Sequence, residues 1–130
     1  MNEEIKIVIP VAPITKKNHQ MIVVNPKTKR PMVMPSKEYR AYEKEAGKYL
    51  APLKKYHVDY PANVKCIYYM KTRRSVDLTN LLEATDDVLV KYGILEDDNS
   101  KVVAGHDGSR VKHDKDFPRT EVYITRMEEV

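Results

Sequence analysis

Cysteine is almost absent from this chain of 130 residues: Cys66 stands alone, so no disulfide can form within one chain. Long apolar runs are absent as well, because the longest mostly apolar stretch, residues 7–14, is far short of the roughly 20 residues that a membrane-spanning helix needs. The first residues include acids where a secretory signal has positive charge, so no export signal is expected. These absences favour a cytoplasmic protein without membrane attachment.

Motifs for several other chemistries are also missing. No glycine-rich phosphate loop occurs, so a nucleotide cofactor is not expected. The four histidines and the single cysteine lack the spacing of zinc ligands, and no nucleophile elbow is recognisable. What remains is a globular composition, with 42% hydrophobic and 32% charged residues and a net charge of +4. It predicts one domain over residues 1–130.

The pattern along the chain predicts a mixed β-sheet with two helices, of the α/β or α+β class, in the order β-β-β-α-β-α-β-β. Ser36 is the expected N-cap of the first helix, and Gly93 is the expected left-handed end of the second. Asp107-Gly108 is either a tight hairpin turn or a bulge. The expected strands cover residues 5–11, 21–24, 32–35, 63–71, 101–113 (divided at Asp107-Gly108) and 119–127. The expected buried face of the first helix consists of Tyr39, Tyr42, Ala46, Tyr49 and Leu50.

A cluster of acids at residues 76–100 is unexpected in a basic chain. An amphipathic helix begins there, and its apolar face follows the 3.6-residue period. That face consists of Leu78, Leu81, Leu82, Thr85, Val88, Leu89 and Tyr92. The acids around it and in the following loop are Asp77, Glu83, Asp86, Asp87, Glu96, Asp97 and Asp98.

A chain that reverses at Gly93 can bring Asp98 back beside the first helical turn, where Asp77 lies. The helix rises roughly 20 Å from Thr79 to Tyr92, and an extended chain from Gly93 to Asp98 returns about 17 Å. Two carboxylates from separate segments suit a hard cation such as Mg²⁺, which can activate water for attack on a phosphodiester. The alternative is an ordinary solvated helix surface, whose acids complement the helix dipole.

Residues 73–103, RRSVDLTNLLEATDDVLVKYGILEDDNSKVV, resemble the RusA family of Holliday-junction resolvases, which are often prophage-borne. The family core has a basic stretch, D-L-x-N-L, a helix of fixed length, a glycine, and a D-D pair followed by a strand. The positions in register are Asp77, Leu78, Asn80, Leu81, Lys91, Gly93, Asp97 and Asp98. The opening strand, with VIPVAPITKKN, is a weaker match.

The resemblance implies a homodimeric, Mg²⁺-dependent endonuclease, with Mn²⁺ as an alternative metal, that nicks four-way DNA junctions symmetrically in recombination and repair. Asp77 and Asp98 match two metal-binding aspartates of the family. Thr79 stands where better-known members have a further aspartate, and Glu83 stands where they have a functional lysine. Because Thr79 and Glu83 are four residues apart on one helical face, Glu83 can replace the missing aspartate in the metal site. The alternative is that Asp97 supplies the third negative charge.

Other residues would support that site. Asn80 and Thr79 are expected to support the ligand carboxylates. The alternative for Asn80 is that it merely lies near the start of the helix. The missing lysine needs a substitute, for which Arg73, Arg74 and Lys91 are nearest in sequence.

Basic residues gather in two stretches, as is typical of proteins that bind nucleic-acid backbones. The alternative for each one is a solvated surface charge. The first stretch contains Lys16, Lys17, Lys27, Lys29, Arg30, Lys37 and Arg40, and the second contains Lys71, Arg73 and Arg74. Branched DNA is therefore the expected partner. Two other functions stay open: a DNA-binding protein without catalysis, and a nuclease for flaps or other branched DNA.

Overall fold

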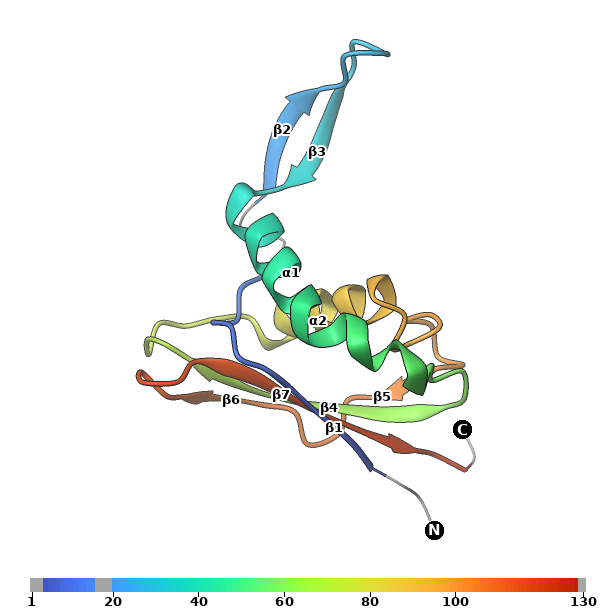
Figure 1. Ribbon diagram of the computed structural model, residues 1–130. Helices are drawn as coiled ribbons and strands as arrows, with labels where there is room; N and C mark the ends of the chain where they lie inside the picture. Colours follow the sequence, from blue (N-terminus) through green and yellow to red (C-terminus); the bar gives the residue numbers. More distant parts are fainter. Residues whose placement is uncertain (1–3, 16–19, 129–130) are drawn as a thin grey trace.

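A five-stranded mixed sheet carries both α-helices on one of its faces (Figure 1). The computed structural model describes residues 4–15 and 20–128 of the chain. β1 (Glu4–Ile9), β7 (Arg119–Arg126) and β4 (Ala62–Met70) are antiparallel neighbours in that order. β5 (Val103–Gly105) and β6 (Arg110–His113) lie along the other edge of β4 and run parallel to it. The predicted mixed sheet and the predicted order of elements are confirmed.

The core lies between the sheet and the helices α1 (Lys37–Leu50) and α2 (Leu78–Lys91). Alternate residues of the central strands point into this layer because side chains of a strand alternate between its faces. The strand residues buried there include Ile7, Ile9, Val64, Cys66, Tyr68, Val122 and Ile124. Such burial contributes roughly 1.5–3 kcal/mol for each large apolar side chain. No helix in the described ranges is long and apolar enough to cross a membrane.

The first helix begins as predicted and differs at one buried position. The hydroxyl oxygen of Ser36 accepts a hydrogen bond of 3.1 Å from the amide of Tyr39. Tyr49, predicted to be buried, is 43% exposed, and Gly47 is buried instead. The ring of Tyr92 lies against Gly47, where an added Cβ would be only 2.3 Å from the ring. A 3₁₀-helix, η2 (Ala51–Tyr56), then continues α1 towards β4.

The segment around Asp107-Gly108 forms no hairpin. β5 and β6 both pair with β4, so the turn between them interrupts two short strands that follow one sheet edge. Gly108 has a φ of 87°, which explains a glycine there. Of the two alternatives, the tight hairpin turn is therefore wrong.

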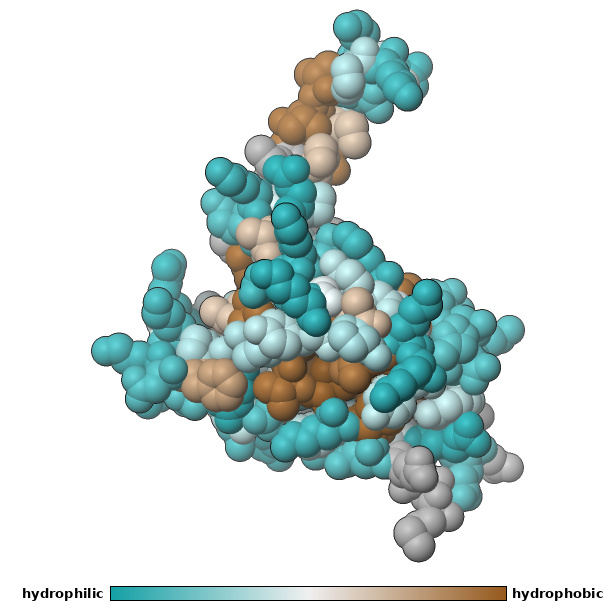
Figure 2. Space-filling view, in the orientation of Figure 1, coloured by the Kyte–Doolittle hydropathy of each residue, from teal (hydrophilic) through white to brown (hydrophobic). Residues whose placement is uncertain are grey.

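A separate hairpin of β2 (Gln20–Val24) and β3 (Pro31–Pro35) projects from the body of the protein near the start of α1 (Figure 1). Ile22 and Val33 face each other across the two strands and are 75% and 60% exposed. Figure 2 shows the hydrophobic stem and the hydrophilic tip of this arm. The tip contains the cations Lys27, Lys29 and Arg30.

Candidate active site

Asp77 is the N-cap of α2. Its Oδ1 accepts hydrogen bonds from the amides of Thr79, at 2.9 Å, and Asn80, at 3.3 Å. These bonds fix the carboxylate at the helix start, where the helix dipole favours negative charge. The side chain is exposed, and its Oδ2 has no hydrogen-bond partner within the described part of the chain. This oxygen can therefore bind a ligand without loss of the cap.

Asp97 and Asp98 form a second acidic centre after α2. Asp97 accepts two hydrogen bonds, one of 2.7 Å from the amide of Asp98 and one of 3.1 Å from the Nδ2 of Asn99. The pKa of Asp98 is raised, first by partial burial and then by the carboxylate of Asp97, with a smaller contribution from Asp87. Negative charge therefore accumulates at Asp98, a condition that a bound cation would relieve.

These two acidic centres lie at opposite ends of α2. The carbonyl oxygen of Val102 accepts a hydrogen bond of 2.9 Å from the amide of Ala62, so the loop that contains Asp98 is held at the start of β4. Asp77 belongs to the connection that follows the other end of β4. Asp87, which lies near Asp98, is ten residues from Asp77, or about 15 Å of helix.

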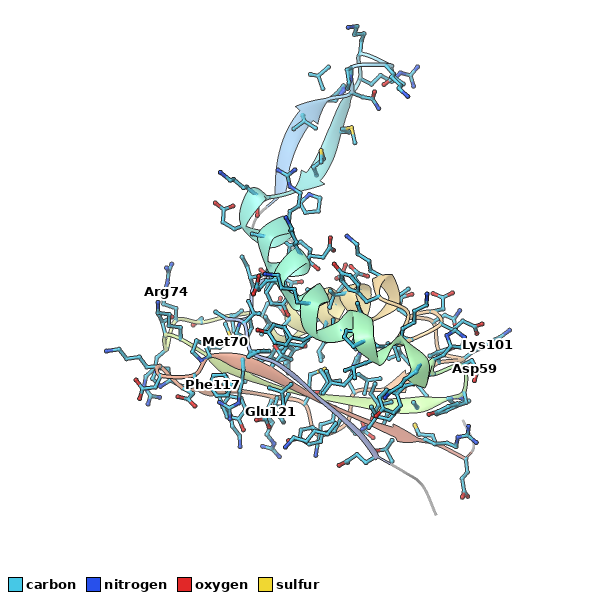
Figure 3. All side chains as sticks on the ribbon, in the orientation of Figure 1. Asp59, Met70, Arg74, Lys101, Phe117 and Glu121 are labelled. Carbon is cyan, nitrogen blue, oxygen red and sulfur yellow. The ribbon has the colours of Figure 1, made fainter. Side chains whose placement is uncertain are left out.

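Figure 3 shows the same separation. Arg74, three residues before Asp77, and Lys101, three residues after Asp98, are labelled at opposite ends of the molecule. Two acidic centres, rather than one cluster, are therefore present in a single chain.

The predicted return of Asp98 to the first turn of the helix is thus wrong within one chain. The prediction assumed an extended chain after Gly93, which does have the expected positive φ, 79°. Instead, the amides of Ile94 and Leu95 both donate to the carbonyl oxygen of Leu89, at 3.0 and 3.3 Å. Leu95 also pairs with Val58, and the side chains of Ile94 and Leu95 are buried. Burial of these two side chains draws the chain towards β4 and away from the helix start.

The donors fit Mg²⁺ in kind but not in position. Carboxylate oxygens are the ligands that this cation prefers. In the described residues, however, no three His, Cys, Asp or Glu side chains converge closely enough to hold a metal ion. A complete Mg²⁺ site therefore needs further oxygen ligands beyond those that one described chain brings together.

The other predicted site residues of α2 lie between these two centres. Glu83 is exposed, and its charge, like that of Asp87, contributes to the raised pKa of Tyr39 on α1. Asn80 and Thr79 orient the carboxylate of Asp77 through their backbone amides. Asp87 was not singled out from the sequence, because only the folded loop reveals its proximity to Asp98.

The predicted DNA-binding cations lie in different surroundings. Arg73 and Arg74 are exposed in the connection before Asp77, and Lys29 and Arg30 lie at the tip of the projecting hairpin. Lys91 forms an ion pair with Glu43 that joins α2 to α1. Lys16 and Lys17 lie outside the described residues.

The alternative that the acids of this helix are ordinary solvated surface residues is wrong for Asp86. Its side chain is buried, and its Oδ2 lies 2.9 Å from the Nε2 of His106, between β5 and β6. The half-buried histidine is the partner that the buried carboxylate requires. No spacing rule indicated this pair, because its members belong to separate elements that only the fold brings together.

Comparison with known proteins places these observations in a family. A search of curated proteins finds no match. The profile of the family described as endodeoxyribonuclease RusA matches residues 10–125, which include both helices and both acidic centres. The resemblance of residues 73–103 is thereby confirmed. The chain belongs to the RusA family of endodeoxyribonucleases.

Proposed function

We propose that this protein is an Mg²⁺-dependent endonuclease that resolves four-way DNA junctions by paired, symmetric nicks. The observation that carries this proposal is the family match over residues 10–125. Within that range, Asp77, Asp97 and Asp98 stand in the motif by which residues 73–103 resemble the family. Recombination and repair of DNA are the processes in which such junctions arise. The surface cations and the exposed acids together suit a nuclease, which must hold a metal against phosphate.

The active site is assembled by two subunits in this proposal. Asp77 is at the start of α2, whereas Asp98 lies near Asp87, about 15 Å further along the helix, so the two centres cannot bind one cation in the same chain. In a twofold homodimer, the Asp77 end of one α2 can meet the Asp98 end of the partner's helix, and the symmetry then creates two equivalent sites. Two such sites would produce the paired nicks.

Each acidic residue has a defined role in that site. Asp77 presents Oδ2 while the helix amides hold Oδ1, and Asp98, with Asp97 beside it, supplies further oxygen donors. Glu83 is the additional candidate ligand because it lies one helical turn after Thr79, the position at which better-known members have a further aspartate. Bound Mg²⁺ would supply an activated water and positive charge for phosphodiester hydrolysis.

The DNA approaches the Asp77 end of the molecule in this proposal. Arg73 and Arg74 precede Asp77, and the chain segment that leads to the projecting hairpin passes beside them, since Thr15 and Arg74 line the same hollow. The cationic tip of the hairpin extends this surface outwards (Figure 1). Backbone phosphates are the ligands that such cations bind.

Mixed dimers of two inactive variants test the shared site. Asp77→Asn and Asp98→Asn, carried on differently tagged subunits, are co-expressed and purified through both tags. A shared site leaves one intact site in each mixed dimer, so the mixture nicks a labelled four-way junction at roughly half the wild-type rate. The products should be single nicks in the presence of Mg²⁺, with no paired cleavage.

The control is a mixed dimer that should be inactive if the site is shared between subunits. A wild-type subunit paired with an Asp77→Asn/Asp98→Asn subunit has no intact shared site, and therefore no nicking is expected. Nicking by this control, together with inactivity of the first mixture, would place each site within one subunit. Tight junction binding by the wild type without cleavage in Mg²⁺ or Mn²⁺ would identify a DNA-binding protein, and cutting of flaps alone would identify another branched-DNA nuclease.

A further inference from the structure

A hollow of about 220 Å³ opens at the carboxyl ends of the parallel strands β4 and β6. Its lining includes Met70, Thr72, Arg73, Arg74, Lys112 and His113. Ligand sites of open sheets with parallel strands commonly lie beyond these strand ends. Four of the lining residues are basic types, and they come from two separate segments of the chain.

A second hollow, of about 510 Å³, shares Arg74 with the first and extends to Ser75 and Val76. Asp77 follows Val76 directly, so Arg74 is separated from Asp77 by three residue steps, which is at most about 11 Å of extended chain. The basic hollow is therefore next to the proposed metal ligand at the start of α2.

The fold holds Lys112 and His113 at this position. Lys112 pairs with Tyr69, and His113 pairs with Met70, the last residue of β4. The amide of Asp114 then donates a hydrogen bond of 2.9 Å to the carbonyl oxygen of Met70. These bonds tie the end of β6 to the start of the connection that contains Arg73 and Arg74.

Nearby acids do not neutralise the hollow. Asp114 and Glu121 both pair with Arg119, at 2.9 and 2.8 Å. The guanidinium of Arg119 also lies 3.7 Å from the centre of the Tyr69 ring, so this arginine is fully engaged in the structure. Within the described ranges, Arg73, Arg74 and Lys112 form no ion pair with an acid. Their positive charge therefore remains available to an anion.

We propose that this hollow binds a backbone phosphate of the DNA strand that is cut at Asp77. Arginine guanidinium groups can donate two hydrogen bonds to one phosphate, and Lys112 adds a compact positive charge. His113 contributes a further ring donor. Lys112 and His113 thereby provide basic groups from the end of β6, in a chain where Glu83 stands at the position of the family's lysine. The inference rests on the proposed function and adds the phosphate contact to it.

The test uses Lys112→Gln alone and together with His113→Gln, with Lys112→Arg as the conservative variant. Lys44→Gln, at an exposed lysine of α1, is the matched control. Affinities for a labelled four-way junction and for a linear duplex of equal length are measured without divalent metal over a range of salt concentrations. Loss of one phosphate contact should lower the slope of log Kd against log salt by about 0.9 and weaken binding about three- to tenfold.

The two DNA substrates separate this inference from the proposed function. Both affinities should fall to a similar extent in Lys112→Gln, further in the double variant, and remain near wild type in Lys112→Arg and Lys44→Gln. Wild-type affinity and salt slope in both glutamine variants would overturn the phosphate site, even if the wild type cuts junctions. A wild type that binds duplex and junction equally and cuts neither would refute the proposed function. The duplex affinities of the glutamine variants would still show whether the hollow binds a phosphate. Absence of any DNA binding by the wild type would overturn both.

Discussion

The Nε2 of His106 lies 2.9 Å from the Oδ2 of Asp86, and its Nδ1 lies 2.8 Å from the carbonyl oxygen of Val64. An imidazolium satisfies both acceptors because it carries a proton on each ring nitrogen. The hydrogen bond to Asp86, more than any other contact, raises the pKa of His106 to about 10. This ion pair therefore joins α2 to β4 through the turn between β5 and β6.

Replacement of this histidine should destabilise the protein most at low pH. The pKa of His106 is about 10 in the folded protein and about 6.5 in an unfolded chain. Its stabilising contribution is therefore complete below pH 6.5 and declines as the pH rises through 10. His106→Gln should lower the free energy of unfolding by roughly 2–4 kcal/mol at pH 6, and by less at pH 10. Urea unfolding at both pH values measures the difference.

The control for this prediction is His57→Gln. His57 is exposed and lies 4.0 Å from Glu96, so its replacement should change stability little at either pH. A loss of stability in His106→Gln that is equal at pH 6 and pH 10 would mean that the histidine acts through packing alone.

Alanine at Gly47 should destabilise the protein although alanine is the better helix former. The gain in helix propensity is about 1 kcal/mol, but the new Cβ would lie 2.3 Å from the ring of Tyr92. The ring is held by a hydrogen bond of 3.1 Å to the carbonyl oxygen of Glu43, so α1 and α2 must separate. Overpacking of this kind costs roughly 1–3 kcal/mol.

Thermal unfolding of Gly47→Ala measures this cost. The same substitution in a protein that already carries Tyr92→Leu tests its cause. Without the aromatic ring, the same alanine should be neutral or stabilising. An equal loss of stability in both backgrounds would exclude the contact between Gly47 and Tyr92 as the reason.

The helices and strands could be predicted from the sequence because short, local residue patterns largely determine them. Val122 and Ile124 alternate with outward-facing residues in β7, and both are buried as the period of two requires. Ser36 and Gly93 act at helix ends through the hydrogen bond and the positive φ that their residue types favour. Each of these features depends on a few consecutive residues.

Features that depend on tertiary contacts could not be predicted in this way. Tyr49 fits the helical period as well as its neighbours, and the packing of Tyr92 on Gly47 decides which of them is buried. Asp86 resembles a surface acid until its contact with His106 is known. The position of Asp98 depends on the pairing of Leu95 with Val58, which no motif encodes.

Asp97→Asn should stabilise the protein slightly at neutral pH when no divalent metal is present. Burial and the neighbouring Asp97 raise the pKa of Asp98, so the ionised pair opposes folding at pH values above that pKa. Asparagine keeps the Oδ1 that accepts the Asp98 amide and removes the charge, and it loses only the exposed hydrogen bond that Oδ2 accepts from Asn99. The free energy of unfolding in EDTA should therefore rise at pH 7, and the gain should disappear as Asp98 becomes protonated at lower pH.

Asp59→Asn, at an exposed acid of the same end of the molecule (Figure 3), controls for the general effect of removing one negative charge. Equal effects of the two substitutions at pH 7 would show that repulsion between Asp97 and Asp98 is unimportant. If the two carboxylates share a cation, excess Mg²⁺ should reverse the order of stability, because the wild type alone gains the full binding energy.

Neutralisation of the hairpin tip should weaken DNA binding without loss of stability. Lys29 and Arg30 are exposed on an arm that projects from the body, so Lys29→Gln/Arg30→Gln should unfold at the wild-type temperature. Each lost phosphate contact should reduce the slope of log Kd against log salt by about 0.9 for a four-way junction. Lys44→Gln/Lys55→Gln removes the same charge from exposed positions outside the arm and should retain the wild-type slope. Equal slopes in the two double variants would mean that the tip acts only through the net charge of the protein, whereas a loss confined to the tip variant identifies the arm as a direct DNA contact.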